Sequence, residues 1–148
     1  KYLRARTYIY FAMISIVGGL MIYQLATRTT SGVSVIHDRT PLFTTLADGS
    51  IRNAYTVRIL NKRPENREFA ITVEGPLNAK VEIVGIPETA DWRPLVEVGP
   101  DRTREVRMIV SVPRTSLNAQ SMPIIVRASD LFVGEIAVAK DNFFGPVN

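Results

Sequence analysis

The sequence predicts one membrane-spanning helix followed by an all-β domain. Three observations carry this prediction. No charged residue occurs between Thr7 and Thr27. Beyond Arg28 the apolar residues recur with a period of two, which is the pattern of half-buried strands. Turn residues separate these runs at intervals of roughly ten residues, a spacing typical of β-sandwiches.

The charge-free run from Thr7 to Thr27 has the length of a membrane span. At the helical rise per residue it makes a helix of about 31 Å, close to the ~30 Å hydrocarbon thickness of a bilayer. Tyr8, Tyr10 and Tyr23 lie near its ends, where aromatic rings favour the interfacial layer. The alternative is a signal peptide, whose apolar core is shorter and is followed by small residues at a cleavage site. The length of the run favours an anchor.

The flanking charges predict the orientation of this helix. Lys1, Arg4 and Arg6 precede the run, and only Arg28 follows it closely. Under the positive-inside rule the N-terminus is cytoplasmic, and the β domain lies on the other side of the membrane. We therefore divide the chain into residues 1–28, the helix with its basic cytoplasmic flank, and residues 29–148, the β domain.

The β domain is expected to contain about seven or eight antiparallel strands, after a polar linker at residues 29–32. Three strands show clear alternation of inward and outward residues, around Tyr55 to Ile59, Phe69 to Val73 and Val106 to Val110. Five further strands are expected at Val33 to His37, Leu42 to Leu46, Val81 to Ile86, Pro123 to Ala128, and Gly134 to Ala139.

Four turns are expected between these strands. Asp48-Gly49 supplies the positive φ of a tight hairpin. The other three are the mixed-charge loop Asn61 to Asn66, interpreted as a solvated hairpin loop, then Glu74-Gly75-Pro76, and Gly99-Pro100-Asp101. Many short strands with frequent turns indicate two packed antiparallel sheets, an immunoglobulin-like sandwich.

The composition excludes several classes of function. The net charge of +4 arises from the first 28 residues, which hold four of the eighteen basic residues and none of the fourteen acidic ones. The remainder is formally neutral and has no basic stripe, so we expect no nucleic-acid partner. The absence of cysteine from the sequence excludes disulfides, thiolate metal sites and cysteine nucleophiles.

We assign no catalytic, cofactor-binding or metal-binding residue. His37 is the sole histidine in the sequence, so most zinc sites are excluded. Its neighbours Asp38 and Arg39 suggest a cluster, but a polar strand end with a salt bridge or a turn contact is the favoured interpretation. Met108 and Met122 are interpreted as core residues. Trp92, in the loop Pro87 to Pro94, is expected to cover one end of the core rather than bind a ligand.

Within the apolar run, Ser15 and Gly19 have the spacing of small residues that lets another helix approach closely. Ala12 lies nearby on the adjoining helix surface. A packing face and an idle lipid-facing surface both remain open, because glycine is common in membrane helices generally.

A resemblance to a known family rests on three ordered strings of residues. They are Asp38-Arg39-x-Pro41-Leu42-Phe43, then Asp48-Gly49-Ser50-Ile51-x-Asn53-x-Tyr55, then Ile59-Leu60-Asn61-Lys62. Matches continue at Phe69 to Gly75 and at Phe143-Phe144-Gly145-Pro146. Together these residues resemble the C-terminal part of the FixG family, also called CcoG or RdxA, the cytochrome c oxidase accessory proteins. The resemblance covers nearly the whole chain.

The resemblance implies a bacterial inner-membrane protein that binds two [4Fe-4S] clusters and ends in a periplasmic immunoglobulin-like domain. It implies a role in assembling the cbb3-type oxidase, by reducing copper(II) to copper(I), with the oxidase or its copper-delivery proteins as partners. This chain departs from that pattern because it has no cluster-binding cysteine. The clusters are therefore expected upstream of Lys1, and this chain itself is expected not to be an enzyme.

Two other function classes remain open. A generic ligand-binding or adhesive ectodomain of a membrane receptor would share the fold, since a fold alone does not determine function. Upstream cysteines with ferredoxin spacing would favour the iron-sulfur protein, and an upstream signalling domain would favour the receptor. A stand-alone hydrolase has the least support, because the sequence lacks a nucleophile motif with a matching base.

Overall fold

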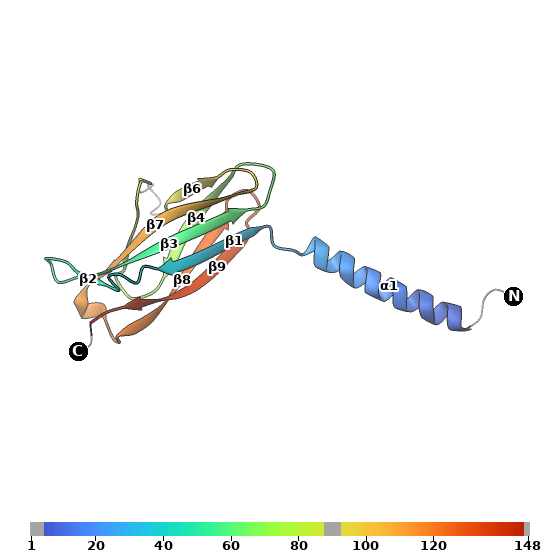
Figure 1. The fold of residues 1–148 in the computed structure, drawn as a ribbon, viewed down its shortest axis with the longest axis horizontal. Coiled ribbons are helices and arrows are strands. Elements are labelled where there is room, and N and C mark those ends of the chain that lie inside the picture. The colour runs from blue at the N-terminus through green and yellow to red at the C-terminus, as the bar shows by residue number, and fades with distance from the viewer. Residues whose placement is uncertain (1–4, 88–92, 147–148) are drawn as a thin grey trace.

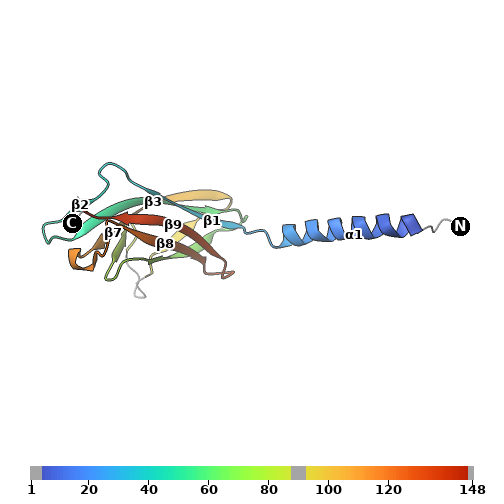
Figure 2. The same ribbon diagram turned by 90° about the horizontal axis from the view of Figure 1, so that it is seen from below.

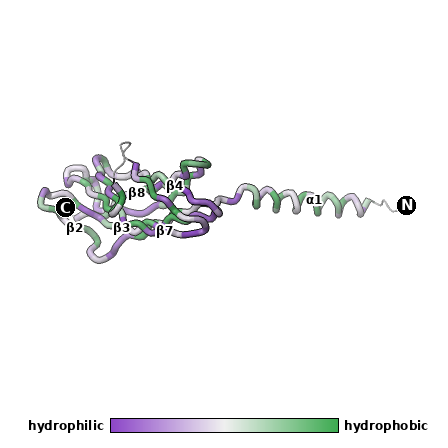
Figure 3. Tube along the Cα trace, turned by 90° about the horizontal axis from the view of Figure 1, so that it is seen from above, coloured by the Kyte–Doolittle hydropathy of each residue, from purple (hydrophilic) through white to green (hydrophobic). Residues whose placement is uncertain are grey.

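The computed structural model describes residues 5–87 and 93–146 and consists of one helix beside a two-layer β-sandwich (Figure 1). The helix, α1 (Ala5–Ala26), projects from one end of the sandwich. None of its residues is buried. It is long and apolar enough to cross a membrane. Figure 3 shows hydrophobic residues along its whole length.

The helix ends where the charge-free run ends. The backbone N–H and the hydroxyl of Thr27 both donate to the carbonyl of Tyr23, at 3.0 and 2.8 Å. These bonds satisfy one of the carbonyls that a helix terminus leaves free. The span predicted from Thr7 to Thr27 thus corresponds to α1, with Thr27 capping its end.

Within the described residues, nine strands form the two sheets of the sandwich, which Figure 2 shows from below. The first sheet has the order β1 (Ser31–His37), β3 (Ile51–Asn61), β7 (Arg102–Val112) and β5 (Lys80–Ile83), and β2 (Thr44–Thr45) also pairs with β3. The second sheet has the order β6 (Leu95–Val98), β4 (Arg67–Glu74), β8 (Ser121–Asp130) and β9 (Ile136–Phe144). A short 3-10 helix, η1 (Arg114–Ser116), precedes β8. All paired strands are antiparallel, and the predicted sandwich is confirmed.

The core lies between the sheets and is built by the predicted alternation. Among the described residues, the largest fully buried side chains are those of Tyr55, Phe69 and Phe143. Each large apolar side chain that is buried contributes roughly 1.5–3 kcal/mol relative to an exposed position. Met108 is fully buried, and Met122 is partly buried against the core, as their interpretation as core residues predicted.

Several predicted strand boundaries were wrong. The strand expected from Leu42 to Leu46 is only the two-residue β2. The strand expected from Val81 to Ile86 ends at Ile83, because Gly85 adopts a φ of +82° in a turn. The strand expected from Gly134 starts at Ile136, since Gly134 has a φ of +72°, and it continues to Phe144. The strand β6 was missed.

One of the four predicted turns is the expected hairpin. Gly49 has a φ of +81°, and its N–H donates to the carbonyl of Leu46 at 2.9 Å. The Asp48 carboxylate accepts from the N–H of Ser50 at 3.0 Å and from its hydroxyl at 2.6 Å. The other three turns connect strands of different sheets and are therefore not hairpins.

The loop between Asn61 and Asn66 is solvated, as expected, but it is not a hairpin, because it joins β3 of the first sheet to β4 of the second. Asn61 is fully buried, and its amide donates to the carbonyls of Glu65, Val98 and Gly99. Arg67, at the start of β4, is 8% exposed and pairs with Glu65 at 2.8 Å. The loop itself is solvated, since Lys62, Pro64, Glu65 and Asn66 are exposed, and it crosses from the first sheet to the second between the buried Asn61 and Arg67. Trp92 lies outside the described residues.

The antiparallel pairing gives the sandwich two distinct ends. The near end, next to α1, contains the start of β1, the end of β3, the start of β7 and the turn between β8 and β9. The far end contains residues 38–50, 75–79 and 113–120, together with Gly145 and Pro146. Because β1 and β9 are edge strands of different sheets that contact one another, they close one side of the sandwich.

Candidate functional site

The far end carries the residues that the sequence singles out around His37. His37 is the last residue of β1 and pairs with Tyr55 of β3, so both side chains lie on the same side of the sheet. Its Nε2 lies 2.9 Å from Oδ1 of Asn53, which is 1% exposed. The same Oδ1 accepts the N–H of Phe144 at 3.3 Å, while Nδ2 of Asn53 donates to the carbonyl of Phe144 at 2.8 Å.

These contacts determine the tautomer of His37. The two bonds to the backbone of Phe144 fix the orientation of the Asn53 amide, so its Oδ1 can only accept. His37 must therefore donate from Nε2. The imidazole ring stacks on Phe144 at 5.2 Å between centroids and is tilted against Tyr55 at 4.9 Å. His37, Asn53, Tyr55 and Phe144 thus form a cluster, the clasp, that links the ends of β1 and β3 to the end of β9.

Tyr55 belongs to the same clasp. It is fully buried, and its hydroxyl donates to the carbonyl of Asn142 on β9 at 2.9 Å. Burial, with a smaller contribution from the negative charge of Asp141, raises the pKa of Tyr55 above its ordinary value. The phenol therefore acts as a neutral hydrogen-bond donor that links β3 to β9.

Asp38 lies just beyond β1 on the outer face of the first sheet. Its N–H donates to the carbonyl of Ala54 at 3.0 Å, and its carboxylate accepts from Nη2 of Arg107 at 2.8 Å. This is the salt bridge at a strand end that the sequence interpretation favoured. His37 and Asp38 point into different environments, and the structure does not bring them together as a reactive pair.

A cleft of about 210 Å³ adjoins this salt bridge. It lies between the segment that follows β1, which includes the cis Thr40-Pro41 bond, and the outer face of β3 and β7. Its lining consists of Asp38, Thr40, Pro41, Thr44, Arg52, Ala54, Arg107 and Ile109. Two guanidinium groups and one carboxylate make it suited to recognising a polar surface.

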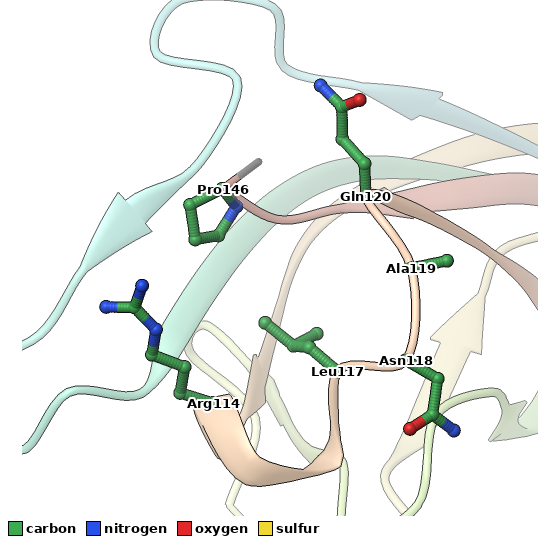
Figure 4. A pocket seen from close by; sticks show the side chains of 6 residues that line it. All are labelled: Arg114, Leu117, Asn118, Ala119, Gln120 and Pro146. Atoms are coloured by element: carbon green, nitrogen blue, oxygen red, sulfur yellow. The ribbon is translucent and has the colours of Figure 1, made fainter. Parts of the chain in front are cut away.

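A second hollow, of about 120 Å³, lies at the same end between the η1 region and the end of the chain (Figure 4). Arg114, Leu117, Asn118, Ala119, Gln120 and Pro146 line it. Leu117 packs closely over Gly145, where a Cβ would lie 3.1 Å from its methyl carbon. The N–H of Gly145 donates to the carbonyl of Gln120 at 2.9 Å. The far end therefore has two hollows, and backbone hydrogen bonds and close packing hold the segments that line them.

Sequence reasoning missed two residues that organise the domain. Asn53 is the central hydrogen-bonding residue of the clasp at the far end. Glu135 has a similar role at the near end, where it links the turn between β8 and β9 to the start of β1. The carboxylate of Glu135 accepts from the N–H and the hydroxyl of Thr30, each at 2.8 Å, and from the hydroxyl of Ser31 at 3.1 Å. Burial raises the pKa of Glu135, but these hydrogen bonds outweigh it and hold the pKa below its ordinary value.

The fold and this arrangement define an immunoglobulin-like β-sandwich module that follows a helix long and apolar enough to cross a membrane. The chain belongs to the family described as "IG-like fold at C-terminal of FixG, putative oxidoreductase", whose model matches residues 21–146. This match confirms the resemblance to the C-terminal part of the FixG family and the immunoglobulin-like fold.

Three relatives show the extent of the similarity. The chain is 33% identical to the nitrogen fixation protein FixG of Rhizobium meliloti over 75% of this chain and 21% of that protein. It is 34% identical to protein RdxB of Cereibacter sphaeroides over 89% of this chain and 27% of that protein. It is 35% identical to protein RdxA of the same organism over 76% of this chain and 23% of that protein. The chain spans about a quarter of the length of these relatives.

A solved structure shares the fold. The crystal structure of a FixG-related protein from Vibrio parahaemolyticus superposes with a TM-score of 0.69 at 20% sequence identity. The similarity covers 81% of this chain and 100% of that one. The β-sandwich is therefore a shared feature of the two proteins.

The [4Fe-4S] clusters that the family resemblance implies do not fit the residues of this chain. Such clusters are held by cysteine thiolates, and the sequence contains no cysteine. Within residues 5–87 and 93–146, no group of three or more His, Cys, Asp or Glu side chains lies together as a metal site would require.

Proposed function

We propose that this chain is the non-catalytic accessory part of a membrane-bound iron-sulfur protein, and that the far end of its β domain contacts a partner protein. The parent protein works in the assembly of a cbb3-type cytochrome c oxidase. An electron from its two [4Fe-4S] clusters, in a region outside this chain, reduces copper(II) to copper(I) for the copper centre of the oxidase. The partner is the oxidase or a protein that delivers copper to it.

The observation that carries this proposal is that the two ends of the sandwich have different features. One end holds the membrane helix, and the opposite end holds two hollows lined by polar and charged groups. A surface that is held away from the bilayer on a rigid frame is well placed to meet another protein. Membership of the FixG family supports the parent's role.

The location proposed for the domain follows from the flanking charges of α1. Three basic residues precede the helix and only Arg28 follows it closely, which favours a cytoplasmic N-terminus in the bacterial inner membrane and a periplasmic β domain. Because the sequence has no cysteine, a single cysteine introduced at Asn118 can report its side of the membrane through a membrane-impermeant maleimide. Labelling in intact spheroplasts supports the periplasmic location, and labelling only after lysis contradicts it.

Two matched arginines on the outer face of the first sheet allow a sharp test of the contact surface. Arg107 pairs with Asp38 at the far-end cleft, at 2.8 Å, and is 60% exposed. Arg58 pairs with Glu105 outside the cleft, at 2.6 Å, and is 48% exposed. Arg107→Glu and Arg58→Glu therefore remove similar ion pairs from different places on one face.

The test compares these variants in the full-length parent protein. We expect Arg107→Glu to lower the amount of active oxidase in cells, while Arg58→Glu leaves it unchanged. Both variants should retain the copper(II) reduction rate of the purified parent. Equal oxidase levels in the two variants would contradict the far-end contact surface. Loss of copper(II) reduction in Arg107→Glu would contradict the non-catalytic role.

A further inference from the structure

The turn between β8 and β9 presents three consecutive apolar side chains to solvent. Leu131 is 53% exposed, Phe132 is 74% exposed and Val133 is 51% exposed. Turns are normally rich in Gly, Asn, Asp, Ser and Pro, because these residues suit the backbone and the solvent. An exposed apolar tip of this kind is characteristic of a surface that meets another apolar environment.

The turn is a fixed structure. The carboxylate of Asp130, which is 1% exposed, accepts the N–H groups of Phe132 at 2.8 Å and Val133 at 3.3 Å. The N–H of Gly134, in a positive-φ conformation, donates to the carbonyl of Asp130 at 2.9 Å. The N–H of Leu131 donates to the carbonyl of Glu68 at 3.1 Å. The backbone therefore holds the three side chains at the tip.

The ring of Phe132 also contacts the side chain of Arg67. The guanidinium carbon of Arg67 lies 5.1 Å from its centroid, and Arg67 is itself almost buried. This cation–π contact keeps the ring at the surface, next to a charge that remains paired with Glu65.

The turn lies at the near end, where the chain leaves α1. Glu135 directly follows the apolar tip, and its carboxylate bonds Thr30 and Ser31. Four Cα steps separate Ala26, the last residue of α1, from Thr30, a distance of at most about 14 Å. Figures 1 and 2 both show the turn on the side of the sandwich that faces the helix. A membrane crossed by α1 therefore has its surface within reach of this tip.

The charges at the near end show which force would act there. The basic residues Lys62, Arg63, Arg67 and Arg102 are offset by the acidic residues Glu65, Glu68, Asp101 and Glu135, with ion pairs between Arg67 and Glu65 and between Arg63 and Glu135. A balanced surface gains little from anionic lipids, since that attraction depends on an excess of Lys and Arg. Any association must come from the apolar tip, and aromatic and aliphatic side chains are favoured in the interfacial layer.

We propose that Leu131, Phe132 and Val133 insert into the phospholipid interface of the membrane that α1 crosses. The interfacial layer is roughly 5 to 8 Å thick on each side of the hydrocarbon core, so a turn tip suffices to enter it. With α1 as the first attachment and the tip as the second, the sandwich is held at a fixed tilt. This contact is independent of the partner proposed for the far end.

The experiment uses the whole chain, reconstituted in phosphatidylcholine vesicles that contain nitroxide-labelled lipid. A fluorophore is attached to a single introduced cysteine, in Val133→Cys at the tip or in Asn118→Cys at the far end. We expect several-fold stronger quenching by the lipid nitroxide at position 133 than at position 118. Adding phosphatidylglycerol should leave this difference unchanged.

A matched pair of additional substitutions tests the cause. Leu131→Ser with Phe132→Ser should reduce quenching at position 133 to the level found at position 118. Leu77→Ser, which removes an apolar side chain that is 75% exposed at the far end, should have no effect. Thermal melting confirms that each variant is folded. Equal quenching at both labelled positions in the unsubstituted background would overturn the proposal, and so would quenching that requires phosphatidylglycerol.

Discussion

Asn53 on β3 exchanges two hydrogen bonds with Phe144 at the end of β9, through Nδ2 to the carbonyl at 2.8 Å and through Oδ1 from the N–H at 3.3 Å. These two residues belong to different sheets and are 91 positions apart in the sequence. The side-chain amide of Asn53 therefore hydrogen-bonds both the N–H and the carbonyl of Phe144, and its Oδ1 also accepts a hydrogen bond from Nε2 of His37.

Asn53→Ala should destabilise the domain by about 2 to 3 kcal/mol, because it leaves partly buried groups of Phe144 and His37 without a partner. Denaturant unfolding measures this change. Asn118→Ala, at an exposed position, serves as the control and should stay within about 0.5 kcal/mol of the parent chain. Equal stability of the two variants would show that solvent replaces the Asn53 bonds without cost.

Glu135 makes the stability of the domain depend on pH. Its folded-state pKa lies below the ordinary value of 4.5, so the ionised carboxylate stabilises the fold above that pH. This contribution is lost as the pH falls through the lowered pKa. The difference in urea midpoint between the parent chain and Glu135→Gln should therefore shrink from about pH 7 to about pH 3.

Glu74→Gln is the matched control for this pH dependence. Glu74 forms an exposed ion pair with Arg127 at 3.0 Å, and its removal should change the midpoint little. A difference between the parent chain and Glu135→Gln that does not vary with pH would contradict the assignment to the carboxylate charge.

Gly49→Val should cost about 1 to 3 kcal/mol of unfolding free energy, because a branched residue is strained at a φ of +81°. No atom lies within 4 Å of the position that a Cβ would occupy, so the cost comes from the backbone and not from a clash. Gly49→Asn should cost less, since asparagine tolerates positive φ. Thermal or denaturant melting in which Gly49→Asn is less stable than Gly49→Val would contradict this explanation.

Removal of residues 1–28 should leave a folded β domain. No residue of α1 is buried, so its loss exposes no part of the core. Circular dichroism should show a β-rich spectrum with a cooperative thermal transition. A helical or unfolded spectrum would contradict the division of the chain at Arg28.

The chain should bind copper(I) more weakly than micromolar. Copper(I) prefers several soft ligands, whereas this sequence offers no thiolate and four separated methionines. His37, its sole imidazole, already donates from Nε2 to Asn53. Titration of residues 29–148 against a copper(I) chelator measures the affinity. Tighter stoichiometric binding that His37→Ala abolishes would make this strand end a copper site.

The sequence predicts those parts of the fold that depend on local patterns. The alternation in Tyr55 to Ile59 and in Val106 to Val110 identifies β3 and β7, since one face of each is buried. The strand β6 was missed because Leu95–Val98 is too short for alternation to stand out beside Pro94. Whether a turn closes a hairpin or crosses between sheets depends on distant pairing, as the loop after Asn61 shows.

The roles of Asn53 and Glu135 at the two ends could not be predicted from the sequence, because they too depend on contacts between residues far apart in the chain. Glu135 and Thr30 are 105 positions apart, and no local pattern relates them. Asn53 belongs to the strings that indicated the FixG family, but its bonds to Phe144 become visible only in three dimensions. The position of Asp38 at a strand end could be predicted, because it depends on the end of β1 alone.

The contact between β1 and β9 has a consequence for the biosynthesis of the domain. The first strand to leave the ribosome has its edge beside the last one, so the sandwich stays open until β9 has been translated. Among the described residues, a product that stops before Glu135 would retain α1 and the eight paired strands β1 to β8, but it would expose Tyr55 and the core beneath it. Quality-control proteases should therefore recognise such a shortened polypeptide as incompletely folded.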